Sequence, residues 1–143
     1  MRIFYSVDLH AGETAFRKFT NAGKFYRADL VLNGGDFTGK MVVPIVESAG
    51  VYTCRYYGST VKVKKAKDIP DLERNLRDAG FYPLLITEAE LNRLNEHDVE
   101  RIIRDKQIEV LRQWIQLADE RYRAADIPCV LIPGSVDDYY LDE

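Results

Sequence analysis

The chain has 143 residues, of which 46% are hydrophobic and 30% charged, and its formal net charge at pH 7 is -3. This composition predicts one soluble globular domain over residues 1–143, able to bury roughly 68–70% of the surface of its unfolded state. The negative charge argues against general binding to nucleic acid, which needs a basic face, and no run approaches the ~20 apolar residues of a membrane span.

The amino-terminal part of the chain predicts a βαβ unit. Short apolar runs predict strands at about residues 2–7 and 29–33, and residues 13–27 carry apolar side chains at helical spacing. Two strands that are joined by a helix are expected to be parallel neighbours in one sheet.

The next part, about residues 42–95, is predicted to be an insertion of different character. It contains a β-hairpin, because residues 51–57 and 60–64 alternate around a turn at Gly58-Ser59. The dense basic run of the sequence falls here and is expected to be a solvated edge rather than a phosphate-binding patch. This run consists of Lys62, Lys64, Lys65 and Lys67.

Two short helices are predicted within the same insertion. Pro70 is expected to open the first, which ends near Ala79 because Gly80 follows. Thr87 and Glu90 form a capping box, which predicts the start of the second helix.

The longest predicted helix covers about residues 98–124, and a third buried parallel strand is predicted at 129–132 after Pro128. The helix has one apolar stripe, made of Val99, Ile102, Ile103, Val110, Trp114, Leu117 and Ala118. Residues 137–143 are acidic and aromatic and are expected to be poorly ordered. The predicted fold is therefore α/β: a βαβ-type sheet with flanking helices and an inserted β-hairpin.

Two carboxylates and an imidazole stand directly after the first two predicted strands. Asp8 and His10 follow the first apolar run, and Asp36 follows the second through Gly34-Gly35. The carboxyl ends of neighbouring parallel strands meet at one crevice, so these side chains are expected to converge. Such oxygen and nitrogen ligands suit Mn, Fe, Zn or Mg. The alternative is that both aspartates are ordinary turn residues at strand ends.

These positions belong to a pattern that covers most of the chain: Asp8-Leu9-His10, Gly35-Asp36 and Gly134-Ser135-Val136-Asp137. The pattern resembles the signature D-x-H … G-D … G-N-x-D of the calcineurin-like metallophosphoesterases. The segment 34–40 and the Ile-Pro pair before the last motif add to the likeness. The resemblance is to the amino-terminal half of the family's signature, because the family's later histidine motifs have no counterpart in the sequence.

The resemblance implies hydrolysis of a phosphomonoester or phosphodiester, in a small molecule or nucleotide, by metal-bound hydroxide. It implies that Asp8 and His10 hold one metal and that Asp36, as a catalytic residue, bridges to a second. Asp137 would also serve catalysis by orienting the site, and the alternative is a plain turn residue.

Two departures from the family pattern bear on activity. Ser135 stands where the family has an asparagine metal ligand, and its hydroxyl is a poorer ligand. Val136 stands where many members carry a histidine that protonates the leaving group. We therefore expect one metal or none in place of the family's two. Two hypotheses follow: a phosphoesterase whose missing ligands come from elsewhere, and a noncatalytic remnant or binding module that holds metal weakly or not at all.

The family's fold packs two sheets face to face, and this chain is expected to resemble half of that sandwich. A sheet face or edge strand would then lie uncovered, which invites pairing with another chain. A homodimer, a separately encoded partner half and a truncated chain each account for this arrangement.

A P-loop is a competing interpretation of residues 34–40, because their glycines and lysine match the start of that motif. Met41 stands where a P-loop has the serine or threonine that holds Mg. A P-loop also needs a helix at this point, and Val42-Val43-Pro44 makes a poor helix start. The P-loop interpretation is therefore disfavoured.

The cysteines, Cys54 and Cys129, lie far apart in the sequence and suggest neither a disulfide framework nor a metal-binding pair. A reducing compartment is the default for such a chain. The first predicted strand begins so close to Met1 that a signal peptide is not expected. These features predict a cytoplasmic location.

Overall fold

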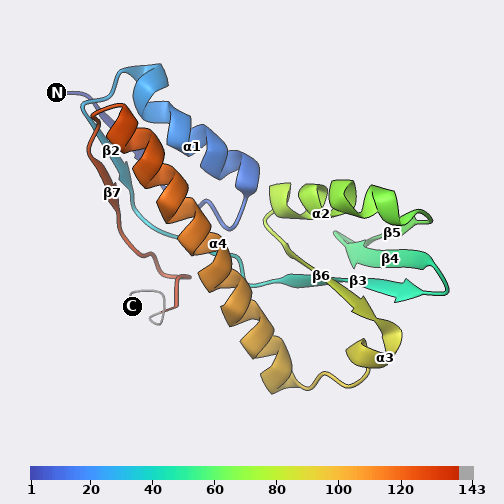
Figure 1. Ribbon diagram of the computed structural model, residues 1–143. Coiled ribbons are helices and arrows are strands. Elements are labelled where there is room, and N and C mark those ends of the chain that lie inside the picture. The colour runs from blue at the N-terminus through green and yellow to red at the C-terminus, as the bar shows by residue number, and fades with distance from the viewer. Residues whose placement is uncertain (139–143) are drawn as a thin grey trace.

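The computed structural model describes residues 1–138 and contains two β-sheets with helices packed against them (Figure 1). The α/β class expected from the sequence is confirmed. No helix among the described residues is long and apolar enough to cross a membrane. Of the tail predicted to be poorly ordered, residues 139–143 lie outside the described residues. The elements are β1 (Ile3–Ser6), α1 (Glu13–Tyr26), β2 (Leu30–Asn33), β3 (Val42–Ser48), β4 (Val51–Tyr56), β5 (Ser59–Val63), the short 3-10 helix η1 (Ala66–Asp68), α2 (Ile69–Asp78), β6 (Tyr82–Thr87), α3 (Glu88–Leu91), α4 (Glu96–Ala124) and β7 (Cys129–Leu131).

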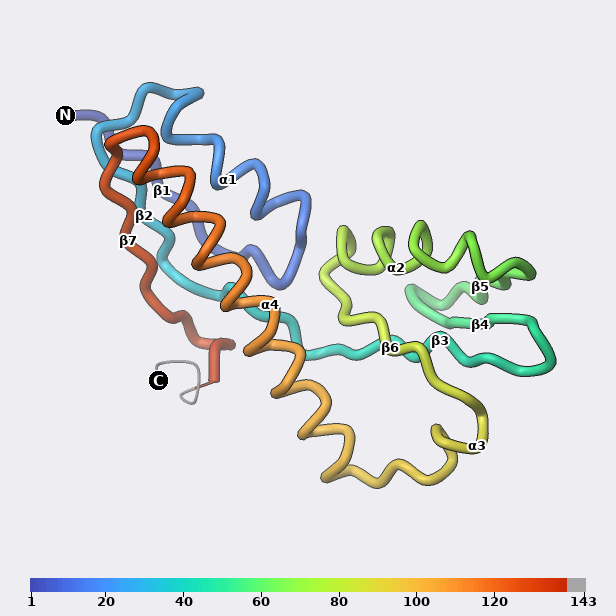
Figure 2. Tube along the Cα trace, in the orientation of Figure 1, coloured from blue at the N-terminus to red at the C-terminus, as the bar shows by residue number. Residues whose placement is uncertain are grey.

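The first sheet is parallel and has the strand order β1-β2-β7. α1 connects β1 to β2, which confirms the predicted βαβ unit, and α4 precedes β7. Both helices lie against the same face of this sheet (Figures 1 and 2). Phe4, Val31 and Cys129, which are neighbours across the three strands, contribute to the core on that face.

The core between the first sheet and its helices is aromatic. Phe16 of α1 stacks on Trp114 of α4, with ring centroids 4.1 Å apart and an angle of 4° between the rings. Phe19 and Tyr122 form an edge-to-face pair of the same two helices at 5.9 Å. Burying one such ring contributes roughly 1.5–3 kcal/mol. The predicted stripe of α4 is buried at Trp114 but exposed at Val99, near the start of the helix.

The opposite face of the first sheet, which we call the outer face, is apolar and exposed. Tyr5, Leu32 and Val130 are neighbours across the three strands on this face, and Tyr5 and Val130 are 59% and 44% exposed. Parallel sheets are normally covered on both faces. The outer face consists of Ile3, Tyr5, Val7, Leu30, Leu32, Val130 and Ile132.

The predicted insertion contains a second sheet rather than an isolated hairpin. The hairpin itself is confirmed, because β4 and β5 pair antiparallel around Tyr57-Gly58. It belongs to a four-stranded sheet of order β5-β4-β3-β6, in which β3 and β6 are parallel. The sequence patterns predict neither β3 nor β6.

A separate small core holds the second sheet together. α2 packs on this sheet, and Ile45 of β3 and Leu76 of α2 are fully buried between them. β5 is an edge strand, and the predicted basic run from Lys62 to Lys67 is exposed along and after it. The predicted capping box of Thr87 and Glu90 is present at the start of α3.

Close contacts join the second sheet to the loops after β1 and β2. Gly80, between α2 and β6, has a φ of +82° and packs so closely on the carbonyl oxygen of His10 that a Cβ atom would overlap it. Gln107 is fully buried in α4 and donates from Nε2 to the Gly39 carbonyl at 2.9 Å. The Gly39 N–H in turn donates to the Tyr82 hydroxyl at 3.0 Å. These contacts hold the second sheet and α4 against the loops that follow β1 and β2.

Candidate metal centre

The residues after β1 and β2 form two adjacent loops at one edge of the first sheet. The Asp8 N–H donates to the Gly35 carbonyl at 3.1 Å, and the His10 N–H donates to the Asp36 carbonyl at 2.9 Å. The pairing of the two strands therefore continues into the loops. This brings the candidate ligands onto neighbouring stretches of backbone.

The three candidate ligands all have left-handed backbone conformations. The φ angles are +59° at Asp8, +43° at His10 and +57° at Asp36. Residues other than glycine rarely adopt this region, although Asp and His do so more often than most. A residue held there costs of order 1–3 kcal/mol and persists only where the surrounding structure enforces it, and such residues cluster at functional sites.

The side chains of Asp8, His10 and Asp36 form one cluster. One ligand atom from each lies within 4.8 Å of the others, and His10 Nε2 is 3.6 Å from Asp8 Oδ1. The side chains of Asp8 and His10 are 58% and 52% exposed, and Asp36 is half-buried. The convergence expected from the strand positions is present, on a surface that solvent reaches.

The donor set of this cluster fits a divalent cation. Ligand atoms at about 2.1 Å from one ion lie no more than about 4.2 Å apart, so small side-chain rotations would bring the three atoms into coordination. Two carboxylates and an imidazole suit Mn, Fe, Zn or Mg. Three protein ligands leave about one to three positions of the ion for water, substrate or another residue.

Residues after β7 contact Asp36 directly. The Val136 N–H donates to Asp36 Oδ1 at 2.9 Å. Gly134 packs on the backbone of Gly35 and Asp36, and a Cβ atom on Gly134 would overlap the Asp36 nitrogen. Ser135 lies between these two contacts in the chain and is exposed. Ser135 therefore lies beside the cluster, because the next residue, Val136, binds Asp36.

Asp137 binds backbone rather than joining the cluster. Its carboxylate accepts hydrogen bonds from the N–H groups of Phe37, Thr38 and Gly134 at 3.2, 2.9 and 2.9 Å, and from the Thr38 hydroxyl at 2.9 Å. Burial alone would raise the pKa of Asp137, but these hydrogen bonds outweigh burial and hold the pKa below its ordinary value. Asp137 thus ties the loop after β2 to the loop after β7.

Two further residues, which no sequence motif indicates, hold these loops. Asn33 at the end of β2 is fully buried; its Oδ1 accepts the Gly35 N–H at 2.8 Å and its Nδ2 donates to Ser6 Oγ at 2.9 Å. Thr38 is buried against Asp137. One feature of the sequence could have indicated Asn33: it is the polar residue that ends the apolar strand Leu30–Asn33.

The P-loop interpretation of residues 34–40 does not agree with the structure. A strand, β3, follows these residues, whereas a P-loop leads into a helix. The Lys40 ammonium lies 3.9 Å from Asp138 Oδ1. The Asp36 carboxylate within the same segment would repel a phosphate.

Comparison with protein-family models, with curated proteins and with solved structures gave no match to this chain. The assignment of a function therefore depends on the geometry of the site and on the sequence pattern around it. That geometry consists of the three-residue cluster, the left-handed loops that carry it and the Asp137 carboxylate behind them.

Proposed function

We propose that this chain is a metal-dependent, phosphoesterase-like hydrolase of the calcineurin-like type, with a divalent cation held by Asp8, His10 and Asp36. One observation carries the proposal: two carboxylates and an imidazole converge within 4.8 Å on backbone conformations that such residues rarely adopt. The order and spacing of the motifs around these residues support the same family.

The residues of the chain have distinct roles in this proposal. A bound divalent cation would polarise a phosphoryl oxygen and lower the pKa of a water molecule toward neutrality. Asp8 and His10 would bind the cation from one loop and Asp36 from the other. Asp137 would be a positioning residue, because it fixes the loop that carries Asp36. The exposed side of the cluster would admit a phosphomonoester or phosphodiester, in a small molecule or nucleotide.

We further propose that a second copy of this chain covers the outer face. A two-fold contact needs a surface that is complementary to itself, and the seven outward side chains are apolar and uncharged. Five of them are substantially exposed, from 39% at Val7 to 59% at Tyr5, and contiguous exposed apolar side chains mark interaction surfaces. Tyr5 and Val7 also lie against Gly34, next to the cluster. A second copy would therefore border the open positions of the cation.

The cytoplasm is the proposed location. Cys54 and Cys129 are free thiols, as is usual in a reducing compartment. Burial raises the pKa of Cys129 to about 11, so little of it is ionised and reactive at neutral pH.

Manganese binding tests the metal site directly. Equilibrium dialysis of the full chain should give one Mn²⁺ per chain, and Asp36→Asn should weaken binding at least about tenfold, because it removes a charged ligand. Asp105→Asn, an exposed aspartate on α4, should bind as the wild type does. Hydrolysis of a chromogenic phosphodiester with added Mn²⁺ should be lost in Asp36→Asn and retained in the control.

The two readouts separate the hypotheses. Stoichiometric metal without turnover would indicate a noncatalytic metal-binding module. Absence of metal binding in the wild type, or equal binding by the wild type and Asp36→Asn, would contradict the proposed centre.

A further inference from the structure

A cavity of about 410 Å³ is lined mainly by residues of α1, α2, β6 and α4. This volume is within the range of small-molecule sites, about 300–1,000 Å³. Ala11 lines the cavity, whereas Asp8, His10 and Asp36 do not. The cavity is therefore a different place from the candidate metal centre.

One wall of the cavity is aromatic. It includes the stacked pair Phe16 and Trp114, which are 1% and 7% exposed, and Phe81, which is 8% exposed. These rings are held by packing within the two cores, so the wall is rigid before any ligand arrives. A flat apolar group would contact the exposed parts of Trp114 and Phe81 there, because Phe16 is covered by Trp114.

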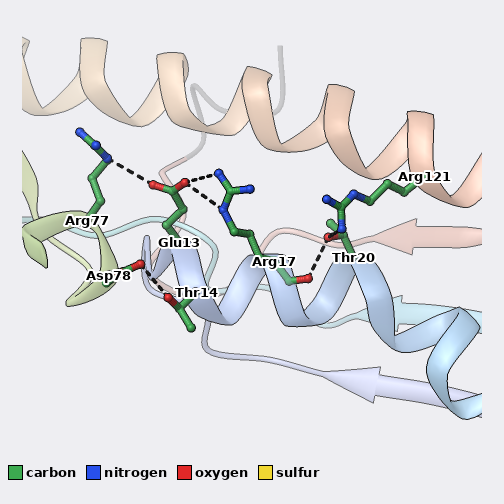
Figure 3. A network of polar contacts seen from close by, with 7 residues as sticks. All are labelled: Glu13, Thr14, Arg17, Thr20, Arg77, Asp78 and Arg121. Carbon is green, nitrogen blue, oxygen red and sulfur yellow. Dashed lines mark hydrogen bonds and ion pairs between the residues drawn. The ribbon is translucent and has the colours of Figure 1, made fainter. Parts of the chain in front are cut away.

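The rim of the cavity carries two arginines that share one carboxylate. Arg17 Nε and Arg77 Nε donate to the two oxygens of Glu13 at 3.0 and 3.2 Å, and Figure 3 shows Glu13 between the two guanidinium groups. Arg17 comes from α1 and Arg77 from α2. The bonds to Glu13 use fewer than the five N–H donors of each guanidinium.

The charge balance of the lining is positive. Three cationic side chains, Arg17, Arg77 and Lys106, stand against two carboxylates, Glu13 and Glu109. Lys106 pairs with Glu109 at 3.0 Å, so the excess among the lining residues lies with the arginines around Glu13. Arg77 Nη1 also lies 3.8 Å from Oε2 of Glu73, which does not line the cavity. The chain as a whole has a net charge of -3, whereas the side chains that line the cavity have a positive balance.

We infer that this cavity binds a small anion with a flat apolar body. The body would lie against Trp114 and Phe81, which Phe16 supports from within the core, and the anionic group would accept hydrogen bonds from Arg17 and Arg77. Guanidinium groups bind carboxylate, sulfonate and phosphate oxygens in pairs, which suits two of them held side by side. This inference does not depend on the proposed metal centre.

Trp114 makes the test specific, because it is the single tryptophan of the chain and lines the cavity. The indole N–H signal in a proton–nitrogen correlation spectrum therefore reports on this place and not on the outer face. We expect anilinonaphthalene sulfonate to shift that signal and to bind at least about tenfold more tightly than phenylnaphthylamine, which lacks the sulfonate.

Variants of α2 identify the anion-binding group. Arg77→Gln should weaken sulfonate binding about tenfold and leave phenylnaphthylamine binding unchanged. Arg74→Gln is the matched control, because Arg74 lies on the same helix in an exposed pair with Asp71 and does not line the cavity. Arg77→Lys, with thermal unfolding of each variant, checks that the fold is retained. An unshifted indole signal, or equal affinity of the wild type and Arg77→Gln for the sulfonate, would overturn the inference.

Discussion

Asp137 stabilises the loops of the candidate site only in its ionised form. Its four hydrogen bonds lower the pKa of the carboxyl group in the folded state relative to the unfolded state. The stabilisation is therefore complete above the unfolded pKa, about 3.9, and is lost as the pH falls through the lower folded pKa.

We predict that Asp137→Asn removes this acid-dependent stability. The variant should be less stable than the wild type at neutral pH, because an amide group cannot accept all four bonds. The difference in unfolding midpoint should shrink as the pH is lowered from 6 toward ~2.5, the range that includes the aspartate pKa values. Thermal unfolding of both proteins across this range measures the effect. Asp105→Asn should keep the wild-type pH profile, and a constant gap between wild type and Asp137→Asn would contradict the explanation.

At the residue scale, the candidate ligands were predictable because their signal is local. Asp8, His10 and Asp36 each follow an apolar strand directly, and the structure brings them together. The residues that hold the loops were not predictable in the same way. Gln107 bonds to Gly39, which is 68 positions away in the chain, and nothing in its own surroundings marks it.

At the scale of elements, α4 begins with a complete capping box. Asn95 Oδ1 accepts the Asp98 N–H at 3.0 Å, and Asp98 Oδ2 accepts the Asn95 N–H at 3.3 Å. We predict that Asn95→Ala lowers the free energy of unfolding by about 1 kcal/mol, because the Asp98 N–H loses its side-chain acceptor. Urea unfolding measures the change. Asn92→Ala, at an exposed asparagine that ends α3 and lies outside this capping box, should cost clearly less, and equal losses would contradict the role of the box.

The sequence patterns do not predict β3 and β6, because each strand contains a proline and the paired residues lie about forty positions apart in the chain. Pro44 and Pro83 lie in the parallel pair of these strands. A proline has no N–H to donate and usually indicates an edge or the end of a strand. β3 pairs with β4 only over Val46–Ser48, so Pro44 lies before that ladder begins. The sequence therefore predicts the hairpin but not the sheet that contains it.

At the scale of the whole molecule, the outer face predicts self-association. We expect sedimentation equilibrium to show a dimer for the wild type and at least a tenfold weaker dimer for Tyr5→Lys, because a lysine ammonium would be buried in an apolar contact. Phe25→Lys is the control, since Phe25 of α1 is 78% exposed away from this face. A wild-type chain that stays monomeric, or equal weakening by both substitutions, would contradict the second copy as occupant.

The bonds between Asp36 and Val136, and between Thr38 and Asp137, join positions about 100 residues apart. A ribosome that adds about 5–20 residues per second needs roughly 5–20 s to make the second partner after the first. Throughout that interval the nascent chain carries all three candidate ligands but lacks the Val136 N–H that binds Asp36. In the proposed centre, tight metal loading would therefore follow translation, and the ion available at that moment in the cell would decide which metal the protein acquires.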